Sequence, residues 1–187
     1  MSIIILNLGC GKKLINGAVN VDFMPGPGIN KVVDLSLHSW PWKNSSVDGI
    51  HASHIIEHFV DQKKFIMECH RILKPGGFLR IVGPHASCIM SVGCLGHHRT
   101  YSLRTFDDYL TKAGYMFIKP LFKTKHQWIN WWYEASGDNI PKWVRPIIWC
   151  IDKPLSHLIN LAPSVYENFF AGVIQSREVV WEGVKCE

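Results

Sequence analysis

The sequence has no long apolar run and no closely paired cysteines, and both absences limit what the protein can be. No stretch of about 18 apolar residues is free of charge, so no membrane span is expected. None of the six cysteines forms a C-x-x-C pair, and no secretory signal precedes them. These features predict a reduced, cytoplasmic protein with free thiols. Hydrophobic residues make up 47% of the 187 residues, which favours a folded domain over disorder.

Charge is also sparse, and it is not concentrated in one place. Charged residues account for 19% of the chain and the net charge is +5. A nucleic-acid-binding protein usually gathers its lysines and arginines in a stripe. The densest group here is Lys119, Lys123 and Lys125. A solvated basic surface is therefore favoured, and no nucleic-acid partner is expected.

Short apolar runs alternate with amphipathic segments along the chain. Apolar residues recur at helical spacing in 60–73, and a second amphipathic helix is predicted over 103–113. This alternation predicts an α/β fold, a doubly wound, Rossmann-like, mostly parallel sheet of seven strands. The predicted strands are 3–8, 19–22, 31–35, 47–52, 78–82, 115–122 and 176–183.

A segment rich in tryptophan and proline, residues 126–168, interrupts the pattern before the last strand. We expect a single domain over 1–187, in which 1–125 form the core, 126–168 an aromatic-rich helical insert and 169–187 the final strand region. The insert is interpreted as a lid over a second substrate. Two alternatives stay open, namely the interface of a homodimer and a membrane-surface patch.

The first predicted strand ends in a turn with two glycines, Gly9 and Gly11, around Cys10. In an open α/β sheet, ligands bind beyond the carboxyl ends of the strands, and glycines there let the backbone approach a ligand closely. The dinucleotide pattern requires a third glycine where Leu14 stands. No Gly-Lys-Ser/Thr follows the turn, which excludes a Walker A loop.

The next two strands each end on an acid, Asp22 and Asp34. The Asp22 carboxylate can accept hydrogen bonds from both hydroxyls of a ribose. Asp34, or the amide of Leu35, can meet the exocyclic amine of an adenine. When each position is considered alone, an aspartate that caps a turn explains Asp22 equally well and Asp34 slightly better.

Taken in order, these motifs resemble those of the class I S-adenosylmethionine-dependent methyltransferases, in the methyltransferase-11-like group. The most characteristic piece is Arg71-Ile72-Leu73-Lys74-Pro75-Gly76-Gly77, and the resemblance covers residues 3 to about 118. Asn7 stands where many members have an acid, and the gap from Gly11 to Asp22 is short. The other matching pieces are Leu6–Gly11, Val19–Asp22, Asp34–Leu35, Ser45–Ile50 and Ser53–His58.

The resemblance implies S-adenosylmethionine as the cofactor and assigns roles to residues along the chain. Gly9, Cys10 and Gly11, with Asn7 beside them, would pass under the methionine part. Asp22 with Phe23 would hold the ribose, and Asp34 and Leu35 would flank the adenine. Ser53 and His54 would line both the cofactor and the site of methyl transfer.

The acceptor is expected to be a small molecule, with a sugar or glycan hydroxyl as the leading hypothesis. Deprotonating a hydroxyl requires a base, and His98, His97 and His85 are the candidates. Base-methylating relatives usually carry Asn/Asp-Pro-Pro-Tyr/Phe after the fourth strand, which this chain lacks. Methylation of RNA ribose and a non-catalytic, cofactor-binding regulatory role remain as alternatives.

No metal site is expected from the linear spacing of the ligand-type residues. Cys88, Cys94, His97 and His98 form a C-x5-C-x2-H-H pattern. This spacing matches no common structural zinc site.

Overall fold

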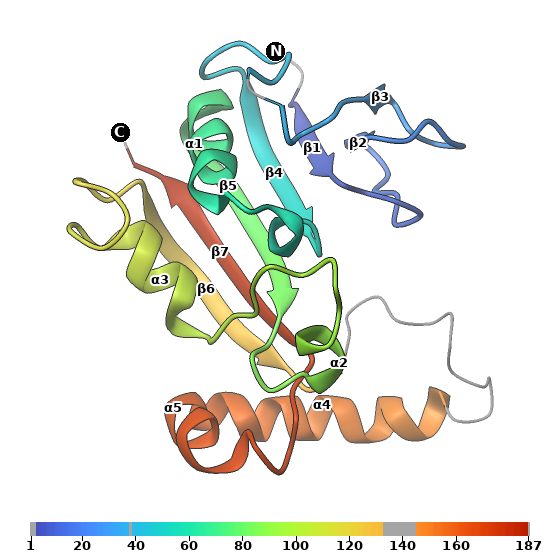
Figure 1. The fold of residues 1–187 in the computed structure, drawn as a ribbon, viewed down its shortest axis with the longest axis vertical. Helices are drawn as coiled ribbons and strands as arrows, with labels where there is room; N and C mark the ends of the chain where they lie inside the picture. Colours follow the sequence, from blue (N-terminus) through green and yellow to red (C-terminus); the bar gives the residue numbers. More distant parts are fainter. Residues whose placement is uncertain (1–2, 38, 133–144, 187) are drawn as a thin grey trace.

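A computed structural model describes residues 3–37, 39–132 and 145–186 and contains one seven-stranded sheet (Figure 1). The strand order is β3-β2-β1-β4-β5-β7-β6, and only β7 runs antiparallel to its neighbours. The predicted α/β, Rossmann-like fold is therefore confirmed. The strands are β1 Ile5–Leu8, β2 Val19–Asp22, β3 Lys31–Val32, β4 Val47–Ser53, β5 Leu73–Pro84, β6 Phe122–Asn130 and β7 Glu178–Lys185.

Helices occur mainly in the second half of the chain. Between β4 and β5 lie a short 3-10 turn, η1 (Ile56–His58), and α1 (Gln62–Ile72). Between β5 and β6 lie α2 (Ile89–Val92) and α3 (Arg104–Thr111). The described residues that connect β1 to β4 form turns and loops without a helix. The remaining elements are α4 Arg145–Leu161, α5 Pro163–Val165 and the π-helical η2 Tyr166–Phe170.

The core forms where the apolar face of α1 packs against the central strands. Phe65, Ile66, Cys69 and Ile72 are all buried, as their spacing predicts. The helix begins after Asp61, whose carboxylate accepts a hydrogen bond from the Lys64 amide at 3.0 Å. The strands contribute Leu6, Leu8, Ile50, Ala52, Leu79, Ile81, Val179 and Trp181, which are almost fully buried.

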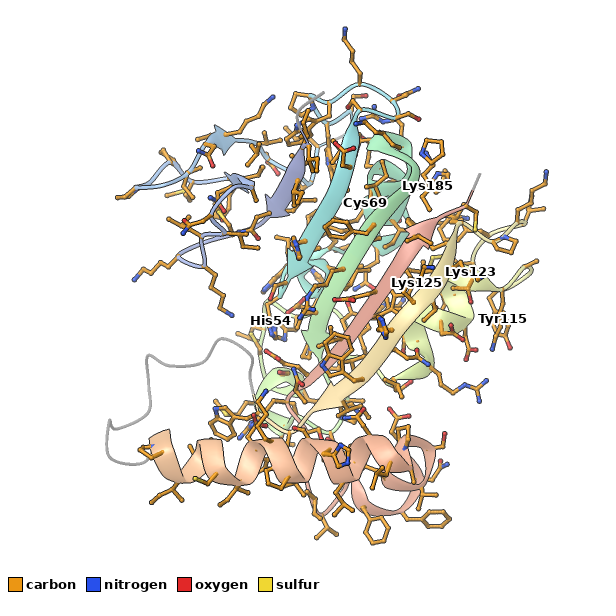
Figure 2. All side chains as sticks on the ribbon, turned by 180° about the vertical axis from the view of Figure 1, so that it is seen from behind. His54, Cys69, Tyr115, Lys123, Lys125 and Lys185 are labelled. Atoms are coloured by element: carbon orange, nitrogen blue, oxygen red, sulfur yellow. The ribbon has the colours of Figure 1, made fainter. Side chains whose placement is uncertain are left out.

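The sixth strand lies later in the chain than the predicted range of 115–122. The apolar run that suggested it is largely exposed, since Tyr115 and Ile118 face solvent. Strand β6 instead starts at Phe122 and continues through Lys123 and Lys125, which are labelled in Figure 2. It is the edge strand of the sheet, and exposed lysines on an edge discourage pairing with other chains. The register of β6 is set by its pairing with β7. The pattern of hydrophobic residues does not reveal this pairing.

The segment 126–168 divides between the sheet and the helices that follow. Residues 126–130 complete β6, and 145–168 lie in α4, α5 and η2, so the insert is helical in this part. Trp143 lies outside the described residues. Across the described ranges, no helix is long and apolar enough to cross a membrane.

Helix α4 lies across the carboxyl edge of the sheet, below the arrowheads in Figure 1. Side chains spaced four residues apart on α4 accept hydrogen bonds from backbone amides at the end of β6. Asn160 Oδ1 accepts from Ile129 at 2.8 Å, Ser156 Oγ from Trp131 at 2.9 Å, and Asp152 Oδ1 from Trp132 at 3.2 Å. The helix thus satisfies one amide near the end of β6 and two amides just beyond the strand.

Arg71 holds the loop before β4 against α1. Its guanidinium donates two hydrogen bonds of 2.7 Å to the carboxylate of Glu68. It also donates to the backbone oxygens of Trp40 and Trp42 and to Asn44 Oδ1. Glu68 in turn accepts from the Trp40 amide at 2.9 Å. The planar fork of an arginine can make these contacts at the same time, whereas a lysine cannot.

We therefore expect Arg71→Lys to lower the free energy of unfolding by about 1–3 kcal/mol, because the paired contact and the loop contacts are lost together. Chemical denaturation measures this change. Arg104→Lys is the matched control, since Arg104 is exposed and forms a single 3.4 Å contact to Asp108. The control should change stability by less than about 0.5 kcal/mol. Equal effects of the two substitutions would contradict this role for Arg71.

Candidate functional site

A cavity of about 710 Å³ opens at the carboxyl ends of β1, β2 and β4. Its walls come from the turn after β1, the end of β2, the loop after β3, the end of η1 and the residues on either side of it, and the first turns of α1. This is the edge at which open α/β sheets bind ligands. The volume lies within the range of about 300–1,000 Å³ that is typical of small-molecule sites.

The turn after β1 requires a glycine at its first position. Gly9 has a φ of +61°, and a Cβ atom there would lie 2.4 Å from Cδ1 of Ile55. Gly11 has a φ of +50° but open space around it. The backbone between them is held by a 3.0 Å hydrogen bond from the Cys10 amide to Val21. A side chain at Gly9 is therefore excluded by its neighbour as well as by its backbone conformation.

Asp22 joins the end of β2 to this turn. Its Oδ2 accepts from the Gly11 amide at 2.8 Å, and its Oδ1 accepts from the Met24 amide at 3.1 Å. An ionised carboxylate has about four acceptor positions. These two contacts leave about one position on each oxygen, which is what two neighbouring hydroxyl groups require.

Asp34 lies at the exposed lip of the cavity, and Leu35 is buried behind it. Hydrogen bonds from the side chain and backbone of Ser36 lower the pKa of Asp34 below its usual value. The Leu35 carbonyl accepts from the indole of Trp40 at 3.1 Å, which connects this wall to the loop held by Arg71.

His54, labelled in Figure 2, lies just beyond the end of β4. Two carboxylates enclose its ring. Its Nδ1 lies 3.1 Å from Glu57 Oε1, and its Nε2 lies 2.8 Å from Glu178 Oε1. Both glutamates are fully buried. Burial lowers the pKa of His54, but the hydrogen bonds and charges of Glu178 and Glu57 overcome this effect and raise it to about 9. His54 is therefore an imidazolium at neutral pH, and both ring nitrogens donate.

The cavity brings together six of the ten residues expected to bind a cofactor. The remaining four, Asn7, Cys10, Gly11 and Ser53, are not among the residues that line it. Asn7 is buried and donates to the Lys13 carbonyl and to Asn20 Oδ1, both at 2.8 Å. The six lining residues are Gly9, Asp22, Phe23, Asp34, Leu35 and His54.

The three histidines considered as bases occupy different environments, and none of them lines the cavity itself. His85 is buried, with Nδ1 accepting from the Ser87 amide at 3.1 Å and Nε2 3.2 Å from Glu167. His97 is half-buried, and its ring meets that of His58 edge-on at 4.9 Å. His98 is exposed, and its amide donates to the Glu57 carbonyl at 2.8 Å.

Sequence reasoning missed two features of this site. His58 was given no functional role from the sequence, but it is exposed and lines the cavity. Its neighbour Glu57 could have been suspected from the spacing His54-x-x-Glu57-His58, which brings all three to one turn. Glu178 gave no local signal, because it lies 124 residues from its partner His54.

Residues 14–81 match the family described as "Methyltransferase domain". A segment of 50 residues is 38% identical to a protein of Mycolicibacterium smegmatis named "Probable S-adenosylmethionine-dependent methyltransferase". It covers 27% of this chain and 20% of that relative, so the chain matches only a fifth of the relative's length. Both matches support membership of the class I S-adenosylmethionine-dependent methyltransferases, the family model over residues 14–81. The resemblance inferred from the motifs is thereby confirmed, and S-adenosylmethionine is the cofactor of this family.

Solved structures agree with the methyltransferase fold. A SAM-dependent methyltransferase from Archaeoglobus fulgidus matches with a TM-score of 0.59 and 15% identity, over 98% of this chain and 86% of that one. One from Mesorhizobium loti matches with a TM-score of 0.54 and 14% identity, over 98% and 90% of the two chains. At such identities the likeness concerns the fold.

The two glycines of the β1 turn allow a matched test of the geometry of this turn. Gly9→Ala should weaken S-adenosylhomocysteine binding at least about tenfold and lower the free energy of unfolding by about 1–3 kcal/mol, because the new methyl group collides with Ile55. Gly11→Ala meets no atom, so only backbone strain of about 1–2 kcal/mol is expected. Calorimetry and denaturation measure both effects. Binding lost equally in the two variants would show that the close contact with Ile55 is not the cause.

Proposed function

We propose that the cavity binds S-adenosylmethionine and that the protein transfers its methyl group to a hydroxyl of a small molecule, with a sugar or glycan as the best candidate. The observation that supports this proposal is that Asp22, at the end of β2, and Asp34, shortly after β3, line one cavity with the Gly9 turn. Bound there, S-adenosylmethionine supplies an electrophilic methyl group on its sulfonium.

The cavity residues fit the parts of this cofactor. Asp22 retains acceptor positions for the two ribose hydroxyls, and Phe23 lies beside it in the wall. Asp34 is ionised at the lip and can accept from the adenine amine, with Leu35 as an apolar wall. Gly9 lines the cavity at the turn where the methionine part would lie.

The base must be a histidine other than His54 or His85. His54 is protonated and both of its nitrogens donate to carboxylates, so it cannot accept a proton. Both nitrogens of His85 are also engaged. His98 is exposed on the loop that the Glu57 carbonyl holds next to the cavity, and we assign it the role of base. The acceptor oxygen gains the methyl group as its proton passes to this imidazole.

Aromatic side chains at the same edge favour a sugar acceptor. Trp131 and Trp132 follow β6 at its carboxyl end, with ring centroids 5.7 Å apart, and Arg177 lies 5.1 Å from the Trp132 ring. Helix α4 fixes the backbone of both tryptophans through Ser156 and Asp152. Aromatic faces of this kind suit the apolar face of a sugar ring.

Removal of the Asp22 charge tests the cofactor assignment. Asp22→Asn should weaken S-adenosylhomocysteine binding about 10- to 100-fold, because hydrogen bonds to a charged acceptor contribute about 1.5–3 kcal/mol. Calorimetry measures the affinity. Asp108→Asn, which removes the same charge from the surface of α3, should leave it unchanged. If the wild-type protein released no heat with this ligand, the proposed function would fail.

Substitution of the proposed base tests the chemistry. His98→Gln should lower kcat about 10²- to 10⁴-fold and leave the affinity for S-adenosylhomocysteine within about twofold, because only proton transfer is affected. Production of S-adenosylhomocysteine on a panel of monosaccharide methyl glycosides provides the assay. His126→Gln, an exposed histidine on β6, serves as the control. Unchanged turnover in His98→Gln would reject the assignment of the base.

A further inference from the structure

Beside the cavity, three side chains from two separate segments approach one another. Glu57 and His58 belong to η1, and His97 comes from the loop that follows α2. One ligand-type atom of each lies within 4.8 Å of the other two. His58 also lines the cavity, so the cluster and the cavity share a wall.

Two polar atoms of this cluster are buried without a hydrogen-bond partner in the described part of the chain. These atoms are Oε2 of Glu57, whose side chain is fully buried, and Nδ1 of His97. The other oxygen of Glu57 is occupied by His54 at 3.1 Å. A buried carboxylate oxygen without a partner costs free energy, and such groups often mark the place of an ion.

In each of the two imidazoles, those of His58 and His97, one nitrogen is hydrogen-bonded and the other keeps a lone pair that can bind an ion. Nδ1 of His58 lies 2.8 Å from the Gly96 carbonyl, which can only accept, so this nitrogen carries the proton and Nε2 is free to coordinate. The His97 ring bonds to the backbone of Ser91, which leaves Nδ1 as its second nitrogen. A backbone carbonyl commonly fixes the tautomer of a metal-binding histidine in this way.

We propose that Glu57, His58 and His97 bind a divalent transition-metal ion of the zinc class. Two imidazoles and one carboxylate form a ligand set that suits Zn²⁺ and its first-row neighbours better than Mg²⁺ or Ca²⁺. Tetrahedral bonds of about 2.0–2.1 Å place ligand atoms about 3.3 Å apart. The three ligand atoms lie within 4.8 Å of one another, so binding an ion would draw them together by up to about 1.5 Å.

The position of the cluster gives the ion a function. With three protein ligands, a tetrahedral ion keeps one position open, and His58 places it at the cavity wall. A hydroxyl bound there would have a lower pKa, so its proton would pass more readily to His98. The role of the ion in lowering the pKa of the hydroxyl rests on the proposed methyl transfer. The binding of the metal ion does not depend on that proposal.

The test uses the full chain without an affinity tag, after removal of metal with a chelator. Titration with CoCl₂ should give visible absorption bands of a four-coordinate ion at one Co²⁺ per chain, and ZnCl₂ should displace them. His58→Gln and His97→Gln should each weaken binding at least about tenfold. His98→Gln and His126→Gln, a near and a distant histidine, should bind Co²⁺ as the wild type does.

Three outcomes would overturn the proposal. They are the absence of Co²⁺ bands in the wild type, bands that persist unchanged in both His58→Gln and His97→Gln, and equal loss in the His98→Gln control. Circular dichroism of each variant separates lost ligands from lost folding. Calorimetry with S-adenosylhomocysteine on the metal-free protein separates this result from the proposed function, because the ligands of the cofactor and of the metal are different residues.

Discussion

The imidazolium of His54 lies between two carboxylates that the fold removes from water, and the carboxyl edge of the sheet is organised around it. Glu57 belongs to η1, and Glu178 begins β7. Glu178 also accepts from Asn130, the last residue of β6, at 3.1 Å. A buried charge without a partner is strongly destabilising. The ends of β4, β6 and β7 must therefore meet at this point for either glutamate to be buried.

The backbone conformation of His54 links its buried ion pairs to the cavity wall at Gly9. His54 has a φ of +52°, a left-handed conformation that turns the chain sharply at the end of β4. The next residue, Ile55, packs over Gly9, and this packing excludes any side chain at that position. The glycine in the first turn and the charged cluster beyond β4 are thus two consequences of one local geometry.

The sequence predicts those parts of the structure whose signals are local. Apolar runs located β1, β2 and β4, and the glycine turn and Asp22 fall at strand ends as expected, whereas β3 ends at Val32, two residues before Asp34. Strand β6 was misplaced because its position depends on pairing with β7 through polar residues. Glu178 could not be found for the same reason, since its role depends on a contact across 124 residues.

This difference explains why the donor side of the site can be inferred more fully than the acceptor side. The walls that face the proposed cofactor follow strand ends in the first third of the chain, so short motifs define them. The proposed acceptor side combines the loop of His97 and His98, the tryptophans after β6 and the helix α4, whose Asp152, Ser156 and Asn160 hold that strand end. Its chemistry is determined by contacts between distant segments. The ligand spacing of Cys88, Cys94, His97 and His98 was uninformative because the partners of His97 in the cluster, Glu57 and His58, precede it by about forty residues.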